Sequence, residues 1–194
     1  MERDKIFFYT FTVTSFFLTL SCSKTLIPER FHYLDYEGKV NQHRKMIKAK
    51  PDIIFNMITD IEIFKTLYPI GFMEVTQSPP NPCNMGTLRH NRIKYLVELN
   101  WDSKVIEIVD NEKIVLRFLN GIFKGGYEIW ELEEKGGDTE VSHTILYTVN
   151  GFFYSMVWFI KKGEKKHDYL VEETLNSIKR KAEVYTVNSV NGIH

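Results

Sequence analysis

The stretch "IKAKPDIIFNMITDIEIFKTLYP", residues 47–69, decides the fold, because the spacing of its apolar residues changes within it. The residues that lead into it, "KVNQHRKMIKA" (39–49), alternate in character and predict a first strand. Pro51 then suits the first turn of a helix whose apolar residues lie three and four positions apart. Asp60 can cap a second short helix that ends before the next proline. The sequence therefore predicts one strand followed by two short helices.

The rest of the chain changes from strand-like segments to one long helical segment. Turns such as "DNE" and "KGGD" are short enough to join neighbouring strands as antiparallel hairpins. The predicted strands are residues 72–77, 87–99, 101–110, 113–120, 123–134 and 139–149. Helical spacing follows from Gly151 to about Val184, where Gly163 can delay the start of the helix. Its apolar stripe comprises Ile160, His167, Leu170, Val171, Leu175, Ile178 and Ala182.

A curved sheet must cover one face, and a helix of 20 or more residues, roughly 30 Å long, is the element able to do so. We therefore predict an α+β fold. A curved antiparallel sheet of six to seven strands wraps a long C-terminal helix, and two short helices follow the first strand. The two layers should leave a gap where they diverge.

Composition limits the function. The 194 residues suffice for one domain with a core, and 25 Lys and Arg balance 25 Asp and Glu. Such a chain lacks the positive charge that nucleic acid binding requires, so we expect no nucleic acid partner. No cysteine and histidine motif for zinc occurs, and we expect neither a metal nor a cofactor. The aromatic content of 14% fits either a large core or the lining of an apolar cavity.

The N-terminus has the features of a secretory leader. An uncharged run from Ile6 to Leu20 is too short to span a bilayer comfortably but has the length of a signal-peptide apolar region. The "SCS" that follows resembles a bacterial lipoprotein signal, which implies a lipid-modified Cys22 and leaves Cys83 as a lone thiol. An ordinary cleaved signal, an uncleaved anchor and a cytoplasmic chain are the alternatives. A disulfide between the two cysteines is a further alternative if the leader is retained.

The order of elements and three sequence blocks resemble the START-like, or SRPBCC, superfamily of polyketide cyclases, lipid-transfer domains and birch-pollen-allergen relatives. The first block is residues 47–69, in which Ala49, Pro51, Phe55 and Asp60 match the family opening. The other two are "GGYEIWELEEKGGDTEV" (125–141) and "LVEETLNSIKRKAE" (170–183). The resemblance implies a helix-grip fold with an apolar cavity. The predicted segments are a signal peptide (1–21), a tether (22–38), the START-like domain (39–186) and a C-terminal tail (187–194).

Strand alternation gives candidate cavity residues. It places Trp130 and Leu132 on one face of their strand, and Val141, His143, Ile145 and Tyr147 on one face of the next. The predicted ligand-binding residues are Phe55, Trp101, Phe118, Trp130, His143, Tyr147, His167 and Val171. Phe153 and Phe159 are assigned to the core, and Arg89, His90 and Arg92 to a solvated face. Both His143 and His167 can alternatively be structural residues without a role in binding.

Three functions remain open from the sequence. The preferred one is a carrier or binding domain for a hydrophobic small molecule or lipid, held at a cell-envelope membrane through Cys22. The second is a cyclase-like or hydrolase-like enzyme that uses His143 with Tyr147 or Glu128 as acid and base. If Glu128 is buried without a partner, its charge is costly or its pKa is raised. The third is a protein-interaction module with a packed interior.

Overall fold

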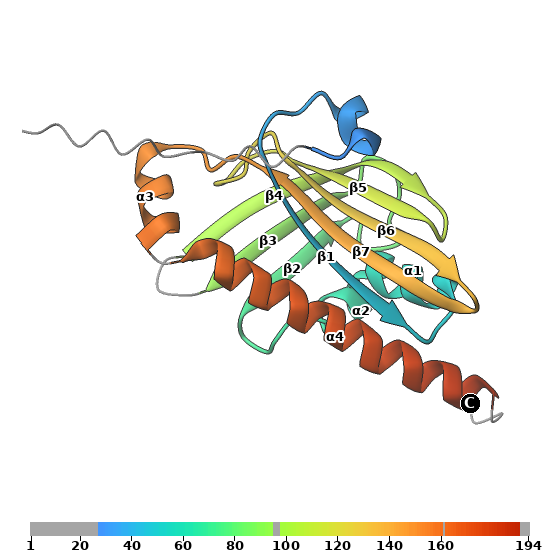
Figure 1. The fold of residues 1–194 in the computed structure, drawn as a ribbon. Helices are drawn as coiled ribbons and strands as arrows, with labels where there is room; N and C mark the ends of the chain where they lie inside the picture. The colour runs from blue at the N-terminus through green and yellow to red at the C-terminus, as the bar shows by residue number, and fades with distance from the viewer. Residues whose placement is uncertain (1–26, 95–97, 161, 191–194) are drawn as a thin grey trace, which may run out of the picture.

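The computed structural model describes residues 27–94, 98–160 and 162–190, and within them a seven-stranded antiparallel sheet holds one long helix against its concave face (Figure 1). The strands are β1 (Lys39–Ile47), β2 (Met73–Ser78), β3 (Leu88–Lys94), β4 (Glu98–Val109), β5 (Lys113–Phe118), β6 (Tyr127–Lys135) and β7 (Asp138–Tyr147). The helices are the 3-10 helix η1 (Glu29–Leu34) and α1 (Pro51–Thr59), α2 (Ile61–Phe64), α3 (Phe152–Ile160) and α4 (Gly163–Val190). The predicted α+β helix-grip architecture is confirmed.

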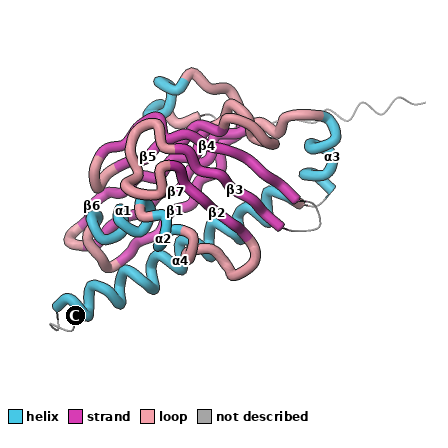
Figure 2. Tube along the Cα trace, turned by 180° about the vertical axis from the view of Figure 1, so that it is seen from behind, coloured by secondary structure: helices cyan, strands magenta, loops and turns pink. Residues whose placement is uncertain are grey.

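The strand order β1-β7-β6-β5-β4-β3-β2 puts the first two strands at opposite edges of the sheet. Helices α1 and α2 make the crossing between these edges, whereas the six strands from β2 to β7 each pair antiparallel with the next strand in sequence. Helix α4 runs diagonally across the sheet from the end near α3 to the far corner (Figures 1 and 2). Its buried residues Leu175, Ile178 and Ala182 are all at 0% exposure, so this stripe seals the main core.

The crossing between β1 and β2 forms as the sequence predicts. Pro51 occupies the first turn of α1, where a missing N–H costs no helical hydrogen bond. Asp60 caps α2, and its Oδ1 accepts hydrogen bonds from the backbone N–H of Glu62 at 2.8 Å and of Ile63 at 3.4 Å. The cap satisfies two amides that a four-residue helix leaves without partners.

The predicted single C-terminal helix is divided into α3 and α4. Lys162, which lies between them, has a left-handed φ of 52°. Gly163 then starts α4 directly beneath the Trp158 indole, where an added Cβ would lie 2.3 Å from the ring. Helix α3 thus turns away from the stripe of α4. The predicted burial of Ile160 and Phe159 is wrong, since they are 61% and 84% exposed.

One residue assigned to a solvated face is buried. Arg89 is 1% exposed, because its side chain points from β3 toward the sheet's concave face. Its Nη2 donates to the carbonyl of Ile58 at 2.6 Å and its Nε donates to Gln77 at 3.1 Å. The guanidinium also lies 4.3 Å from the centre of the Phe64 ring. The neighbouring His90 is exposed, as the alternation predicts.

The bounds of β3 and β4 also differ from the prediction. The sequence predicts one strand over residues 87–99, but β3 ends at Lys94 and β4 begins at Glu98. Asn91 is therefore paired with Trp101, which moves Trp101 from the start of a strand into the sheet. Alternation alone could not locate the end of β3 or the start of β4, because no strong turn residue stands between them in the sequence.

Part of the predicted tether is packed on the sheet. Within residues 22–38, η1 covers the convex face with Phe31, which is 1% exposed, and with Leu34. These two contact a small second core that includes Ile129 and Leu146. The Tyr127 hydroxyl donates to the carbonyl of Leu34 at 3.3 Å. The folded region therefore begins before residue 39, because apolar side chains of η1 cover the outer face.

The predicted lipid attachment at Cys22 lies outside the described residues. Cys83 is buried, at 6% exposure, beside Arg89. Within residues 27–94, 98–160 and 162–190, no helix combines the length and the apolar character needed to cross a membrane.

Candidate functional site

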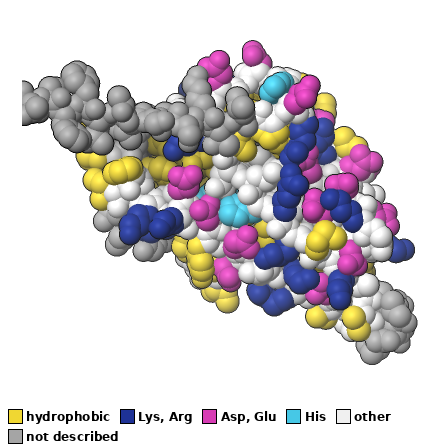
Figure 3. All heavy atoms as spheres, in the orientation of Figure 1, with side chains coloured by type: hydrophobic (Ala, Val, Ile, Leu, Met, Phe, Trp, Pro, Cys, Tyr) yellow, Lys and Arg dark blue, Asp and Glu magenta, His cyan; other side chains and the backbone are white. Residues whose placement is uncertain are grey.

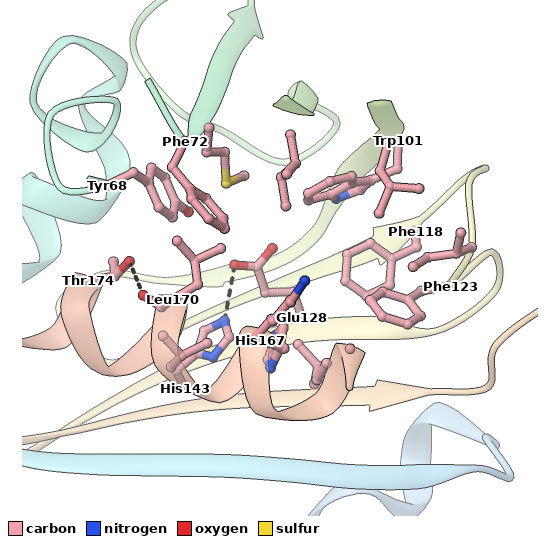
Figure 4. A pocket seen from close by; sticks show the side chains of 18 of the residues that line it. Tyr68, Phe72, Trp101, Phe118, Phe123, Glu128, His143, His167, Leu170 and Thr174 are labelled. Carbon is pink, nitrogen blue, oxygen red and sulfur yellow. Dashed lines mark hydrogen bonds and ion pairs between the residues drawn. The ribbon is translucent and has the colours of Figure 1, made fainter. Parts of the chain in front are cut away.

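A cavity of about 190 Å³ lies between the sheet and the N-terminal half of α4 (Figure 4). The sheet supplies one wall, α4 the opposite wall, and the loop between α2 and β2 closes one side. Trp158 of α3 and Phe123 of the β5–β6 connection stand at the end near α3. The cavity is lined by Tyr68, Phe72, Met73, Ile93, Leu99, Trp101, Phe118, Ile122, Phe123, Glu128, Trp130, His143, Ile145, Trp158, Gly163, Lys166, His167, Leu170, Val171 and Thr174. Apolar and aromatic side chains dominate this set, as they do in pockets for hydrophobic ligands.

Six of the eight residues predicted to bind ligand line this cavity. They are Trp101, Phe118, Trp130, His143, His167 and Val171. Their positions follow from strand alternation and from the helical stripe of α4, both of which can be read from the sequence. Their roles in binding stay predictions.

Two predicted residues do not line the cavity. Phe55 lies on α1 and packs against the main core from outside the cavity. Tyr147 lies two residues beyond Ile145 on β7, and is enclosed by Phe123 and Trp158 at ring-centre distances of 5.0 and 6.1 Å. Burial, followed by the negative charges of two carboxylates on α4, raises the pKa of Tyr147 to about 12. It therefore stays a neutral phenol and is a poor acid or base near pH 7.

Sequence reasoning missed several cavity residues because they lie on connections rather than in regular elements. Tyr68 and Phe72 come from the loop between α2 and β2, and Phe123 comes from the β5–β6 connection. In the sequence each of them is an isolated aromatic residue near a proline or glycine. Such a residue belongs to no repeating pattern, so the sequence does not indicate which way its side chain faces. Trp158 is not predicted as a cavity residue, because the sequence predicts one continuous C-terminal helix where the structure has α3 and α4.

The polar centre of the cavity is a buried pair, Glu128 and His143, joined across β6 and β7. Glu128 Oε1 accepts from the Trp130 indole at 2.9 Å and lies 3.3 Å from His143 Nε2 (Figure 4). The side chains of Glu128 and His143 are 15% and 5% exposed. A raised pKa is predicted from the sequence only if Glu128 has no partner. In the structure its carboxylate is paired with His143 and Trp130.

The environment of Glu128 favours its ionised form. Burial alone would raise the pKa of its carboxyl group. The hydrogen bond and charge of His143, the charge of Arg89 and the bond from Trp130 together outweigh burial and hold this pKa below its ordinary value. An ionised carboxylate only accepts hydrogen bonds, so His143 Nε2 carries the hydrogen in this contact.

Three polar atoms of the cavity lining are buried without a hydrogen-bond partner among the described residues. They are the indole Nε1 of Trp101, the Nδ1 of His143 and the Nδ1 of His167. Such atoms are costly to leave unpaired, and a bound molecule can supply the missing partners. Trp101 can only donate, whereas the Nδ1 of His143 accepts from a ligand when the ring is neutral and donates to one when the ring is charged. The lining therefore suits an apolar molecule with one or two polar groups.

His167 connects the cavity to a second polar cluster on β1 and α4. Its ring lies 6.1 Å from that of His143 and 6.5 Å from that of His43, and these two histidines are opposite each other in the β1–β7 register. Burial of the ring, followed by the charges of His143 and His43, lowers the pKa of His167 to about 3. The imidazole is therefore neutral at physiological pH.

The outer cluster is the part of the described chain in which a metal ion could be held. His43, His167 and Asp168 each offer one ligand atom, and these atoms lie within 4.8 Å of one another. Both ring nitrogens of His43 already have protein contacts, however. Nε2 lies 3.0 Å from the oxygen of Asn41 and 3.3 Å from Asp168, and Nδ1 lies 3.2 Å from Glu172. His43 and Asp168 are thus held in a hydrogen-bond network, whereas the Nδ1 of His167 has no partner among the described residues. The residues come from separate elements, so no sequence motif marks the group.

Comparison with known proteins supports the fold. No family model matches the chain, and no curated protein matches it. The structure of TTHA0849 from Thermus thermophilus matches with a TM-score of 0.62 and 16% identity, over 75% of this chain and 98% of that one. The di-domain ARO/CYC StfQ from the steffimycin biosynthetic pathway matches with a TM-score of 0.61 and 11% identity, over 76% and 51%. Ara h 8.0201 matches with a TM-score of 0.52 and 10% identity, over 74% and 96%.

These similarities confirm the helix-grip fold that the START-like resemblance implied. At such low identity the likeness extends to the fold alone, and the function has to be argued from the cavity.

Proposed function

We propose that the protein is a non-enzymatic carrier or binding domain for a hydrophobic small molecule or lipid, tethered to a cell-envelope membrane through Cys22. The observation that supports it most is the cavity of about 190 Å³, lined by apolar side chains around the buried pair of Glu128 and His143. The interior is thus not fully packed, which argues against the interaction-module alternative.

Desolvation would drive binding, since each Å² of apolar surface that leaves water contributes about 25 cal/mol. The polar lining would set the orientation of the ligand. A ligand hydroxyl can donate to the carboxylate of Glu128 or to the Nδ1 of His143, and an ether or carbonyl oxygen can accept from Trp101. We therefore expect a ligand with an apolar body and at least one hydroxyl or carbonyl group.

The binding proposal is tested by filling the cavity. Val171 lines the cavity and is 5% exposed, whereas Val187 lies on the same helix and is 57% exposed. Val171→Phe should abolish binding of a fluorescent fatty-acid probe, and Val187→Phe should leave it unchanged. Thermal melting of both variants checks that they are folded, since overpacking costs typically 1–3 kcal/mol, an order-of-magnitude figure. If the wild-type protein binds no probe and carries no lipid in native mass spectrometry after membrane extraction, the proposal fails.

The tether is tested separately by the intact mass of the membrane-extracted protein. Cleavage before Cys22 together with an added acyl mass would support lipidation, and Cys22→Ser should abolish both. An unmodified full-length mass would overturn the tether and leave the binding proposal untouched.

A second candidate function is favoured by the buried pair itself. A carboxylate that holds an imidazole in an apolar cavity can support general acid–base chemistry, as a cyclase-like or hydrolase-like enzyme would need. The co-purified ligand can be incubated with the protein and followed by mass spectrometry. His143→Ala should abolish any conversion and keep most of the binding, whereas the carrier proposal predicts no conversion by either protein.

A further inference from the structure

Helix α3 has one apolar face that is turned away from the protein. Phe152, Met156, Phe159 and Ile160 are spaced by four, three and one positions, so they form one stripe along the helix. Their exposed fractions are 87%, 43%, 84% and 61%. Figure 3 shows hydrophobic side chains gathered over α3 at the left edge of the molecule. A stripe of this kind on a nine-residue helix is the signature of a contact surface rather than of scattered surface residues.

The opposite face of α3 is fixed to the domain. The Trp158 ring lines the cavity and packs edge-on against Phe123, with ring centres 5.1 Å apart. The start of the helix is held where Asn150 donates to the carbonyl of Lys124 at 2.9 Å. Because Trp158 and the entry to the helix are both held in this way, the exposed stripe lies on the side of α3 that is turned away from these contacts.

Positive charge borders the stripe at both ends of α3. Lys162 and Lys165 are exposed directly after the helix, and Lys124 is exposed beside its beginning. Glu164 is the acidic residue among them. In Figure 3 the Lys and Arg side chains over the first turn of α4 lie beside the apolar area. An apolar stripe with lysines beside it matches the boundary of a bilayer, where acyl chains meet anionic head groups.

We propose that α3 docks on an anionic lipid bilayer, with its exposed stripe in the head-group region and the flanking lysines on lipid phosphates. A second copy of the chain fits this face less well, since a symmetric contact would bring the lysines of both copies together. The contact would place the Trp158 end of the cavity against the membrane. It is independent of a lipid on Cys22 and of what the cavity binds.

A local probe on α3 tests the contact even if the N-terminus holds the protein on the vesicle. Full-length Cys22→Ser protein is prepared with Met156→Cys on α3 or, as the matched control, with Val187→Cys on the distal part of α4. Each engineered thiol carries an environment-sensitive fluorophore. Cys83 should escape labelling, because its thiol is 6% exposed and burial raises its pKa.

With phosphatidylcholine vesicles containing phosphatidylglycerol, the label at 156 should shift its emission to the blue and be quenched by acyl-chain quenchers. The label at 187 should not change. Replacing Lys162 and Lys165 together by Gln should weaken vesicle binding by about tenfold or more, since each lysine near an anionic surface contributes on the order of tenfold or less. The pair Lys104→Gln and Arg180→Gln, exposed elsewhere, should have little effect.

Any one of three results would overturn the proposal: no response of the label at 156, the same response of both labels, or the same response on vesicles of phosphatidylcholine alone. Absence of vesicle binding would instead favour a protein partner for the stripe. Fatty-acid probe binding by the same proteins in solution reports separately on the cavity.

Discussion

Replacing Glu128 by Gln is the most direct test of the buried pair, because it keeps the shape of the side chain and removes its charge. Glu128 Oε1 accepts from Trp130 at 2.9 Å and from His143 at 3.3 Å, with the side chain 15% exposed. Hydrogen bonds to a charged group contribute about 1.5–3 kcal/mol, against about 0.5–1.5 kcal/mol for neutral ones. The variant should therefore be less stable than the wild type by about 1–2 kcal/mol at pH 7.

The stability difference between wild type and Glu128→Gln should depend on pH in a definite direction. The folded pKa of Glu128 lies below its unfolded value of 4.5. The stabilisation is therefore complete well above pH 4.5 and is lost as the pH falls through the lower, folded pKa. The stability difference between wild type and Glu128→Gln should be largest at neutral pH and should shrink toward zero in acid.

Urea unfolding, followed by tryptophan fluorescence at several pH values between 7 and 3, measures this difference. For a chain of this size the melting temperature should differ by about 2–8 °C at pH 7. Glu134→Gln, an exposed change on the same strand, is the control and should have little effect. A variant as stable as the wild type at pH 7, or a difference that stays constant with pH, would refute the reasoning.

Two substitutions and one titration test the packing, the helix cap and the buried histidine around the cavity. Leu175→Ala, in the 0%-exposed stripe of α4, should cost about 2–5 kcal/mol in urea unfolding, and a loss below 1 kcal/mol would contradict the packing described. Asp60→Ala removes the cap of α2 and should cost about 0.5–2 kcal/mol, whereas Asp60→Asn should restore most of it; equal losses would contradict the capping role. In an NMR titration the His167 ring should stay neutral from pH 7 to about 4, because burial lowers its pKa to about 3; a midpoint near 6.5 would contradict that burial. Stability from His167 should be complete above pH 6.5 and decline as the pH falls toward 3.

The sequence by itself determined most of the regular elements and many of the faces that they bury. Pro51 and Asp60 mark helix starts through local backbone chemistry, and the alternation around His143 specifies which side of β7 faces inward. These features depend on neighbours within a few residues, so they can be read along the chain. The same local logic identified six of the residues that line the cavity.

The tertiary structure decided which of these inward residues meet, and which surfaces stay uncovered. Pairing of β6 with β7 brings Glu128 to His143, and burial and charge then set the pKa of the carboxyl group. The turn at Lys162 separates α3 from α4, so Phe159 faces outward although its helix is strongly apolar. Such outcomes depend on contacts between residues far apart in the sequence, and on the space left between the layers, which no local pattern records.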